Sequence, residues 1–203
     1  MQKIIILDKV QELFMKYGLK SVSMDDISRT LGISKKTLYQ CVENKKDLVQ
    51  QIFAKHIEEE QTAIDEIVAE SGDALEAILG IAKYITALLR EMSPTTLYDI
   101  QKYYGDTWQM IQRLQNKYIY QIIKKNIEQG MTEGLYRKDL NADIVAKLYV
   151  GKTFIIVDEE VFPLKEYNIE NLYWEYIRYH IHGIASAKGL KLLAKHTKHT
   201  TND

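Results

Sequence analysis

Residues 23–48 read SMDDISRTLGISKKTLYQCVENKKDL, and this stretch decides the fold expected for the N-terminal region. Ser23 precedes a helical run and has Asp26 three residues further on, a spacing typical of a capped helix start. Ile27 and Leu31 lie four residues apart, so they share one face of that helix. The stretch therefore predicts a short amphipathic helix.

Gly32 ends this helix, because glycine adopts the left-handed turn without steric cost. Ser34 offers a second N-cap, and residues 35–40 form a short polar helix. A helix, a glycine turn and a short polar helix make the helix-turn-helix pattern, whose second helix enters the DNA major groove. The same spacing also fits an ordinary helical hairpin with a solvated basic end.

The side chains of the second helix suit DNA binding. Lys35 and Lys36 bring positive charge to its start. The hydroxyls of Thr37 and Tyr39 can bond phosphate oxygens, and Gln40 can pair with adenine. We expect contacts in the groove from Lys35, Lys36, Thr37 and Gln40, and contacts to phosphate from Tyr39 and Lys45.

At the level of single residues, the region resembles the DNA-binding domain of TetR-type (TetR/AcrR) bacterial transcription regulators. The positions that match the family pattern are Leu13, Phe14, Gly18, Ser23, Ile27, Leu31, Gly32, Ile33, Ser34, Thr37, Leu38, Tyr39, Lys45 and Leu48. The family usually has His-Phe where this chain has Cys41 and Val42. This departure removes one phosphate donor.

The resemblance implies an all-α protein with an N-terminal three-helix domain and a C-terminal helical domain that binds an effector and dimerises. We expect the first domain at residues 1–46, with its motif at about 24–43, the second at 47–193, and a frayed tail at 194–203. The implied function is a transcriptional regulator, most often a repressor, that binds palindromic operator DNA as a homodimer.

The remaining helices are predicted from apolar spacing and from breaks in it. A first helix at 2–17 has Ile6, Val10, Leu13, Phe14 and Tyr17 on one face. The others are expected at 47–70, at 74–90, from Ser93-Pro94, at 108–129 with Asp106 or Thr107 as cap and Gly130 as stop, at 141–157 and at 168–193.

Charge is unevenly distributed along the chain. Residues 1–50 hold nine Lys or Arg and six Asp or Glu, a balance of +3, and residues 51–203 hold the remaining eighteen and twenty-two, a balance of −4. Attraction to phosphate is therefore expected in the N-terminal part.

Cysteine usage and the apolar runs point to a cytoplasmic location. Cys41 is the only cysteine, which excludes an intramolecular disulfide; a structural thiol is favoured over a redox sensor. The apolar run near the N-terminus is too short for a signal-peptide core, and no run approaches the length of a membrane span. We expect no membrane contact.

The resemblance also implies a ligand cavity among the helices between residues 74 and 129. Aromatic rings with a hydroxyl can surround and orient a bound molecule, although they also fill ordinary cores. Few basic residues lie on the apolar stripes, so we expect a largely apolar small effector. The residues expected to contact it are Tyr84, Tyr103, Tyr104, Trp108, Tyr118 and Gln121.

The final helix carries a broad apolar stripe made of Leu172, Tyr173, Tyr176, Ile177, His180, Ile181 and Ile184. A stripe that packs only within its own domain is usually narrower. We therefore expect this stripe in a dimer interface, with packing inside its own domain as the alternative.

No pattern supports catalysis, a metal or a cofactor. His180 and His182 point to different sides of a helix, and His196 and His199 lie in a lysine-rich tail without acidic or thiol neighbours in the sequence. Two alternatives stay open. In the first, the chain is a DNA-binding protein of this fold that has no effector and is either constitutive or controlled by a protein partner. In the second and more remote one, it is an enzyme that carries a helix-turn-helix.

Overall fold

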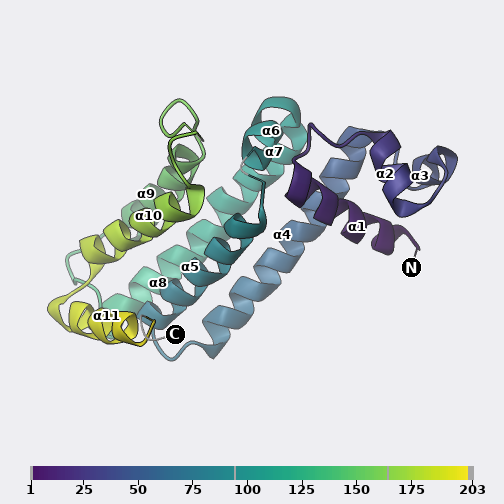
Figure 1. Cartoon of the computed structure of the whole chain (residues 1–203). Helices are drawn as coiled ribbons and strands as arrows, with labels where there is room; N and C mark the ends of the chain where they lie inside the picture. The colour runs from purple at the N-terminus through teal and green to yellow at the C-terminus, as the bar shows by residue number, and fades with distance from the viewer. Residues whose placement is uncertain (1, 94, 164, 201–203) are drawn as a thin grey trace.

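The computed structural model describes residues 2–93, 95–163 and 165–200, and the regular elements in these ranges are all helices. Pro94 and residues 201–203 of the expected tail lie outside them. A small lobe contains α1 (Gln2–Tyr17), α2 (Met24–Leu31) and α3 (Lys35–Cys41), and α4 (Lys45–Glu70) leads away from it (Figure 1). The all-α fold is confirmed.

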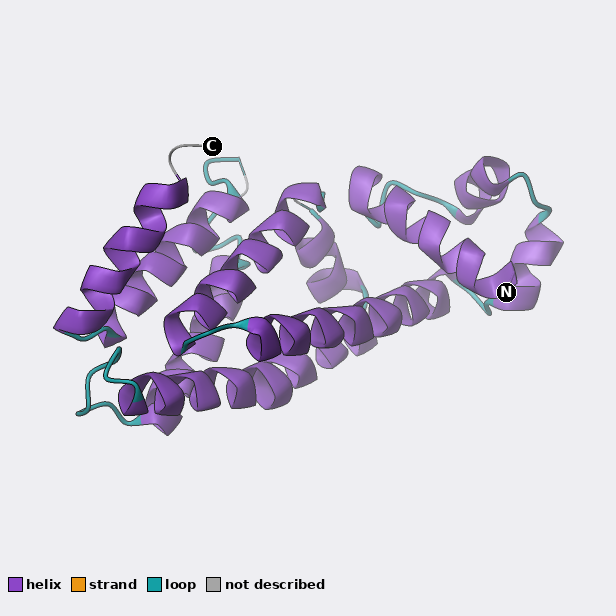
Figure 2. Ribbon diagram, turned by 90° about the horizontal axis from the view of Figure 1, so that it is seen from below, coloured by secondary structure: helices purple, strands orange, loops and turns teal. Residues whose placement is uncertain are grey.

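The larger body is a bundle in which α5 contacts α4, α8 and α10, and α9 contacts α8 and α10. Its elements are α5 (Ala74–Glu91), α6 (Thr96–Tyr103), α7 (Gly105–Arg113), the π-helix η1 (Leu114–Ile119), α8 (Tyr120–Thr132), α9 (Ala142–Ile156), α10 (Ile169–Ile184) and α11 (Ala187–Thr200). Both views place α1–α3 at one end of the molecule and α11 at the other (Figures 1 and 2).

The helix expected at 108–129 differs from the prediction at both ends and in the middle. It begins as α7 at Gly105, so neither Asp106 nor Thr107 caps it. A π-helical stretch interrupts it, and α8 continues to Thr132. Gly130 lies inside α8, where a Cβ atom would come within 2.1 Å of the Tyr136 ring. Glycine is therefore needed there for close packing rather than for a stop.

The helix expected at 168–193 is two helices, α10 and α11. The chain turns at Ser186, whose Oγ donates to the carbonyl of Gly134 and accepts from the amide of Gly189. The amide of Arg137 donates to the carbonyl of Ile184 and ties this turn to the segment after α8. Helix α11 then runs to Thr200, past residue 194, where the sequence predicts the start of a frayed tail.

Two clusters of buried apolar side chains hold the molecule together. The first joins α1, α2, α3 and the N-terminal half of α4 around Val10, Phe14, Ile27 and Leu38, each at most 1% exposed. Tyr17, expected on the same face, is 52% exposed, because the chain turns at Gly18 directly after it.

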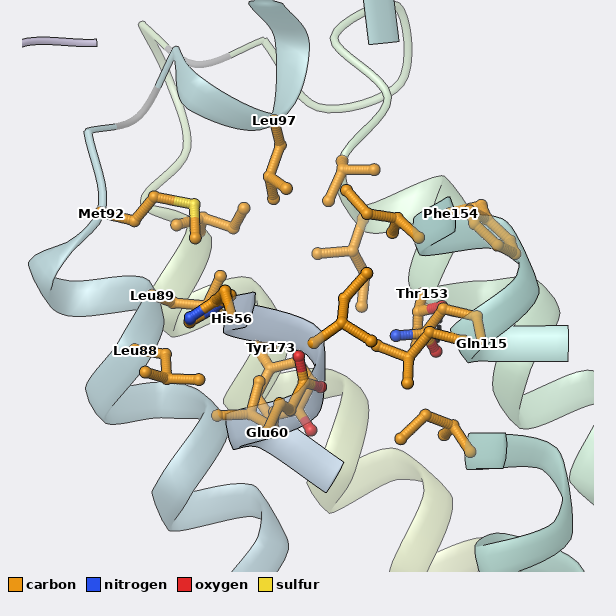
Figure 3. A pocket seen from close by; sticks show the side chains of 18 of the residues that line it. His56, Glu60, Leu88, Leu89, Met92, Leu97, Gln115, Thr153, Phe154 and Tyr173 are labelled. Atoms are coloured by element: carbon orange, nitrogen blue, oxygen red, sulfur yellow. Dashed lines mark hydrogen bonds between the residues drawn. The ribbon is translucent and has the colours of Figure 1, made fainter. Parts of the chain in front are cut away.

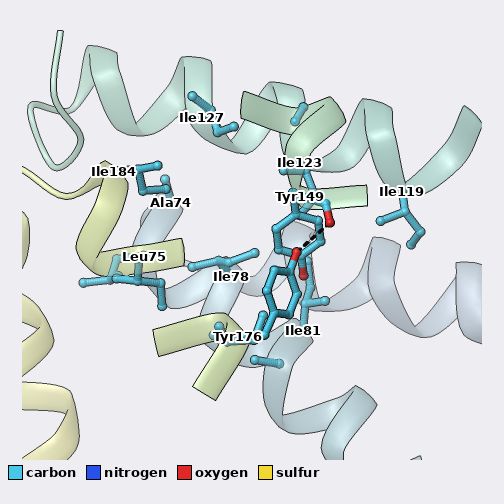
Figure 4. Packing of buried hydrophobic residues seen from close by; sticks show 14 of the residues in the cluster. Ala74, Leu75, Ile78, Ile81, Ile119, Ile123, Ile127, Tyr149, Tyr176 and Ile184 are labelled. Carbon is cyan, nitrogen blue, oxygen red and sulfur yellow. Dashed lines mark hydrogen bonds between the residues drawn. The ribbon is translucent and has the colours of Figure 1, made fainter. Parts of the chain in front are cut away.

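The second cluster fills the larger body. It extends from Leu75 and Ile78 on α5 to Ile123 and Ile127 on α8 and to the residues of α9 and α10 that face them (Figure 4). Within it the hydroxyl of Tyr176 donates to the carbonyl oxygen of Tyr149 at 2.9 Å. This polar atom is thus buried without loss of its hydrogen bond.

Candidate functional site

The turn between α2 and α3 has the geometry that the sequence predicts. The amide of Asp26 donates to Ser23 Oγ, and the amide of Ser23 donates to Asp26 Oδ2, which together form a capping box. Gly32 closes α2 with φ +64°, and Ser34 Oγ accepts from the amide of Thr37 to start α3. Local side-chain chemistry therefore fixes the angle at which α3 is presented.

Helix α3 turns one side to the core and leaves the other to solvent. Leu38 is fully buried, whereas Lys36, Tyr39 and Gln40 are exposed. Lys35 is exposed as well but forms an ion pair with Asp25. The α3 surface is thus polar, basic and uncovered within the chain, at the end of the molecule farthest from α11 (Figure 1).

Lys45 does not fit the phosphate role expected for it. Its Nζ donates to the carbonyl oxygen of Leu19 at 2.5 Å and lies 5.8 Å from the centre of the Phe14 ring. Burial lowers the pKa of this ammonium, with smaller opposing effects from Asp99 and Asp26. The side chain therefore holds the turn after α1, and the neighbouring Lys46 is the one that is exposed.

A cavity of about 160 Å³ lies between α4 and the helices that pack against it. Most of its lining is aliphatic, with Met92 and Leu97 at one end (Figure 3). Polar atoms come from Gln115 and Thr153, and the two side chains approach at 3.5 Å. An apolar space with a few polar groups is the usual form of a small-molecule site.

Of the six residues expected to contact an effector, only Trp108 lines this cavity. Tyr118 turns away, and its hydroxyl donates to the carbonyl of Gln61 and to Asp65. Tyr103 lies under the ammonium groups of Lys20 and Lys102 and is 39% exposed.

The other three also fall outside the lining. Tyr84 and Tyr104 are half-buried against the two clusters, and Gln121 is exposed. Tyr84, Tyr103 and Tyr104 precede η1, so the π-helical turn changes the facing only of Tyr118 and Gln121. Helical spacing alone does not tell which face of each helix lines a cavity.

Sequence reasoning missed the titratable groups of the cavity, His56 and Glu60. They lie one helical turn apart on α4 among Phe53, Ile57 and Ile64. A carboxylate at a stripe position of an amphipathic helix was the available signal. Burial lowers the pKa of His56 and raises that of Glu60 to about 7.

The stripe expected at a dimer interface faces its own domain. Tyr173, Tyr176, Ile177, His180, Ile181 and Ile184 are all buried within the single chain, and Leu172 is half-buried. Burial also lowers the pKa of His180 to about 4. The physical reason is that α5 and α9 already cover this face of α10.

Apolar side chains remain uncovered on another surface, which we call the α9–α10 face. It comprises Ile144, Leu148 and Ile155 on α9, between 49% and 56% exposed, and Tyr179 on α10, which is 70% exposed. The ammonium of Lys152 lies 4.5 Å from the centre of the Tyr179 ring. The three α9 residues recur at helical spacing and so form one stripe.

Within the described ranges, no group of three or more His, Cys, Asp or Glu side chains is placed to hold a metal ion. The helices in those ranges also include none that is long and apolar enough to cross a membrane. Cys41 is a free, half-buried thiol.

The capped glycine turn and the exposed helix after it define a helix-turn-helix DNA-binding protein. Residues 6–52 match the sequence model of the family described as "Bacterial regulatory proteins, tetR family". The chain belongs to the TetR family of transcriptional regulators and binds DNA through this domain. Regulators of this family are not enzymes.

Relatives agree with this assignment. The chain is 26% identical over 166 residues to "Uncharacterized HTH-type transcriptional regulator YhgD" of Bacillus subtilis (strain 168), a match that covers 75% of this chain and 83% of that one. A TetR-family regulator from Agrobacterium tumefaciens has the same fold, with a TM-score of 0.71, 17% identity, and coverage of 91% and 97%.

A further similar structure is a transcriptional regulator from Saccharomonospora viridis, described as in complex with choline. It has a TM-score of 0.68 and 17% identity over 91% of this chain and 98% of that one. At this identity the likeness concerns the fold.

We predict that Glu60→Gln stabilises the protein above neutral pH. The folded-state pKa of about 7 lies above the ordinary 4.5, so the native state holds the proton more tightly and loses stability as pH rises from about 4.5 to 7. That difference corresponds to roughly 3 kcal/mol at most. Urea unfolding at pH 5 and pH 8 measures it.

The exposed neighbour supplies the control, since Glu58→Gln changes the same charge on the same helix. We expect little difference between this variant and the wild type at either pH. An equal effect of the two substitutions at pH 8 would show that burial of Glu60 is not its cause.

Proposed function

We propose that this regulator responds to a small molecule and represses transcription from palindromic operators as a homodimer. The observation that carries the ligand response is that the cavity and the DNA-binding core share a wall. Phe53, Leu97, Trp108 and Ile111 line the cavity and also pack in or against the first apolar cluster. A ligand that moves these side chains therefore acts on the core that supports α3.

Two rigid connections support this transmission. Helix α4 is continuous from the capped start after α3 to the far end of the bundle. Helix α6 is the second connection, because Asp99 Oδ2 accepts from the amide of Lys20, and the amide of Ser93 just before α6 donates to the carbonyl of Met15. A ligand changes DNA affinity only to the extent that it prefers one arrangement of these elements.

The α9–α10 face is the surface we propose for dimerisation. An uncovered apolar stripe of this kind is typical of an interaction surface, and symmetric dimers use the same patch on both subunits. Two-fold symmetry would then present two α3 helices to half-sites about one helical turn, or a multiple, apart. This proposal replaces the buried stripe of α10.

The alternative without an effector is the weaker one. A regulator that binds no effector is expected to have a fully packed bundle, whereas this bundle contains an apolar cavity with polar groups on its wall. The choline complex of the similar regulator from S. viridis gives further support to small-molecule binding by this fold.

We predict that Lys36→Ala lowers affinity for all DNA sequences and reduces the salt slope by about one per subunit. Lys45→Ala should instead leave the slope unchanged and destabilise the N-terminal domain, because its ammonium holds the Leu19 carbonyl. Binding to duplexes selected from random DNA is measured by fluorescence anisotropy at several salt concentrations. A reduced slope in Lys45→Ala with normal stability would restore its phosphate role.

We predict that Leu148→Glu produces a monomer, because a charge in a closed apolar interface is left without water or a partner. Val68→Glu is the matched control, since Val68 is also an exposed aliphatic residue but lies on α4. Sedimentation velocity gives the mass of each variant. A dimer of unchanged strength in Leu148→Glu would place the interface elsewhere.

We predict that Ile85→Trp, which fills the cavity, abolishes the ligand response and leaves operator affinity intact. Ala87→Trp adds the same ring at an exposed position of the same helix and should respond normally. The measurement is release of operator DNA across a panel of small apolar compounds. Compounds that release DNA equally from both variants act outside the cavity.

A further inference from the structure

Among the residues that the structure describes, the charged groups of the cavity wall do not include a fixed cation. Glu60 is its only carboxylate, and no lysine or arginine contributes to the lining in the part of the chain described. The wall also contains His56, and an unperturbed histidine has a pKa near neutrality. Burial lowers the pKa of His56 and so disfavours its charged form. The wall thus carries a negative charge or none, and it offers no fixed cation to a bound anion.

The carboxyl group of Glu60 has no partner within the described ranges. It is only 9% exposed, and none of the hydrogen bonds or ion pairs found there involves its side chain. Burial of a carboxylate without a donor or a counter-charge is costly, and natural proteins usually supply one. In Figure 3 the Glu60 side chain lies with those that line the cavity, near Tyr173.

The tyrosines around Glu60 do not supply the missing donor. Burial raises the pKa values of Tyr84 on α5, Tyr118 on η1 and Tyr173 on α10, and the charge of Glu60 adds a smaller rise, so these hydroxyls stay neutral. The Tyr118 hydroxyl donates to Gln61 and Asp65 instead. The Tyr173 hydroxyl lies 3.5 Å from that of Tyr149 on α9.

A polar groove outside the cavity has the same sign of charge. Asp8, Glu12, Glu59 and Glu91 line it, against two lysines, Lys16 and Lys55. Lys55 is already paired with Asp8 and Glu59. His56 and Leu88 line both the groove and the cavity, so the two spaces adjoin at these side chains. Carboxylates around an opening raise the local concentration of cations.

We propose that the effector of this cavity is a compact organic monocation, with an ammonium group that pairs with Glu60 and an apolar body among the aliphatic side chains. The inference rests on the proposed function, because it assigns a ligand class to the same cavity. The acidic groove attracts the cation, and the ammonium group gives the Glu60 carboxylate the counter-charge that no side chain in the described ranges provides. Trp108 and Phe154, whose ring centres lie 5.9 Å apart, supply aromatic surface for the apolar part.

Three probes of similar size and different charge test this proposal: phenethylammonium, 2-phenylethanol and phenylacetate. Each is titrated into the full chain without DNA by isothermal titration calorimetry at pH 8. We expect phenethylammonium to bind at least about tenfold more tightly than 2-phenylethanol, as a charge-assisted hydrogen bond requires. Phenylacetate should bind most weakly.

Variants then assign the preference to one side chain. Glu60→Gln should bring the affinity for phenethylammonium down to that for 2-phenylethanol, whereas Glu58→Gln, outside the cavity, should keep the preference. Affinity for the cation should rise between pH 6 and pH 8, because binding requires the ionised carboxylate. His56→Gln should keep this pH dependence, which separates Glu60 from the imidazole of His56, whose pKa burial lowers.

The outcomes are distinct. Equal or tighter binding of 2-phenylethanol or phenylacetate, or a cation preference that survives Glu60→Gln, overturns the inference. If neutral compounds release operator DNA through the cavity but no cation binds, the proposed function stands and the inference fails. If none of the probes binds and no compound releases DNA, both fail.

Discussion

The architecture depends on one continuous helix that belongs to both hydrophobic cores. Leu48, Val49 and Ile52 on the first turns of α4 pack in the DNA-binding core, and Ile64 packs in the bundle. Between these anchors the backbone hydrogen-bond ladder leaves no hinge, so a displacement of the middle of α4 moves both ends. The cavity lies against this middle part, where Phe53, His56 and Glu60 project from α4.

Helix α6 provides a second attachment between the bundle and the DNA-binding lobe, in addition to α4. Ile100 is fully buried among residues of the first cluster, although the other buried members of that cluster all lie between Ile6 and Phe53 in the sequence. The carboxylate of Asp99, 4% exposed, accepts from the amide of Lys20 in the turn after α1. With one attachment the small lobe could pivot freely about α4, whereas two attachments make its orientation depend on how α4 and α6 sit around the cavity. Ligand volume between them is thereby coupled to the position of α3.

The sequence was sufficient where local chemistry decides the structure. Ser23, Asp26 and Gly32 act on atoms within a few residues of themselves, so the capping box and the left-handed turn follow directly from their identities. The faces of the later helices depend on partners far along the chain. Tyr118 turns away from the cavity because its hydroxyl reaches α4, and the face of α10 is covered by α5 and α9. Periodicity shows that a stripe is buried but not which element buries it. For this reason the structure places five of the six expected pocket residues outside the cavity lining and packs the expected dimer stripe within the chain.

Glu60 is a carboxylic acid at a buried position of α4, where an apolar side chain would stabilise the fold more. The neighbouring buried positions on α4 are His56, whose charged form burial disfavours, and the apolar Ile64. An aliphatic side chain at residue 60 would remove a desolvated carboxylate and close the cavity further. Stability alone therefore gives no reason for an acid there. Departures from local consistency are expected at functional sites, where the cost is offset by a bound partner. A carboxylate kept unpaired on the one helix that both cores share lies where binding of a counter-charge has the greatest mechanical effect, because the same atoms that gain the partner support the position of α3.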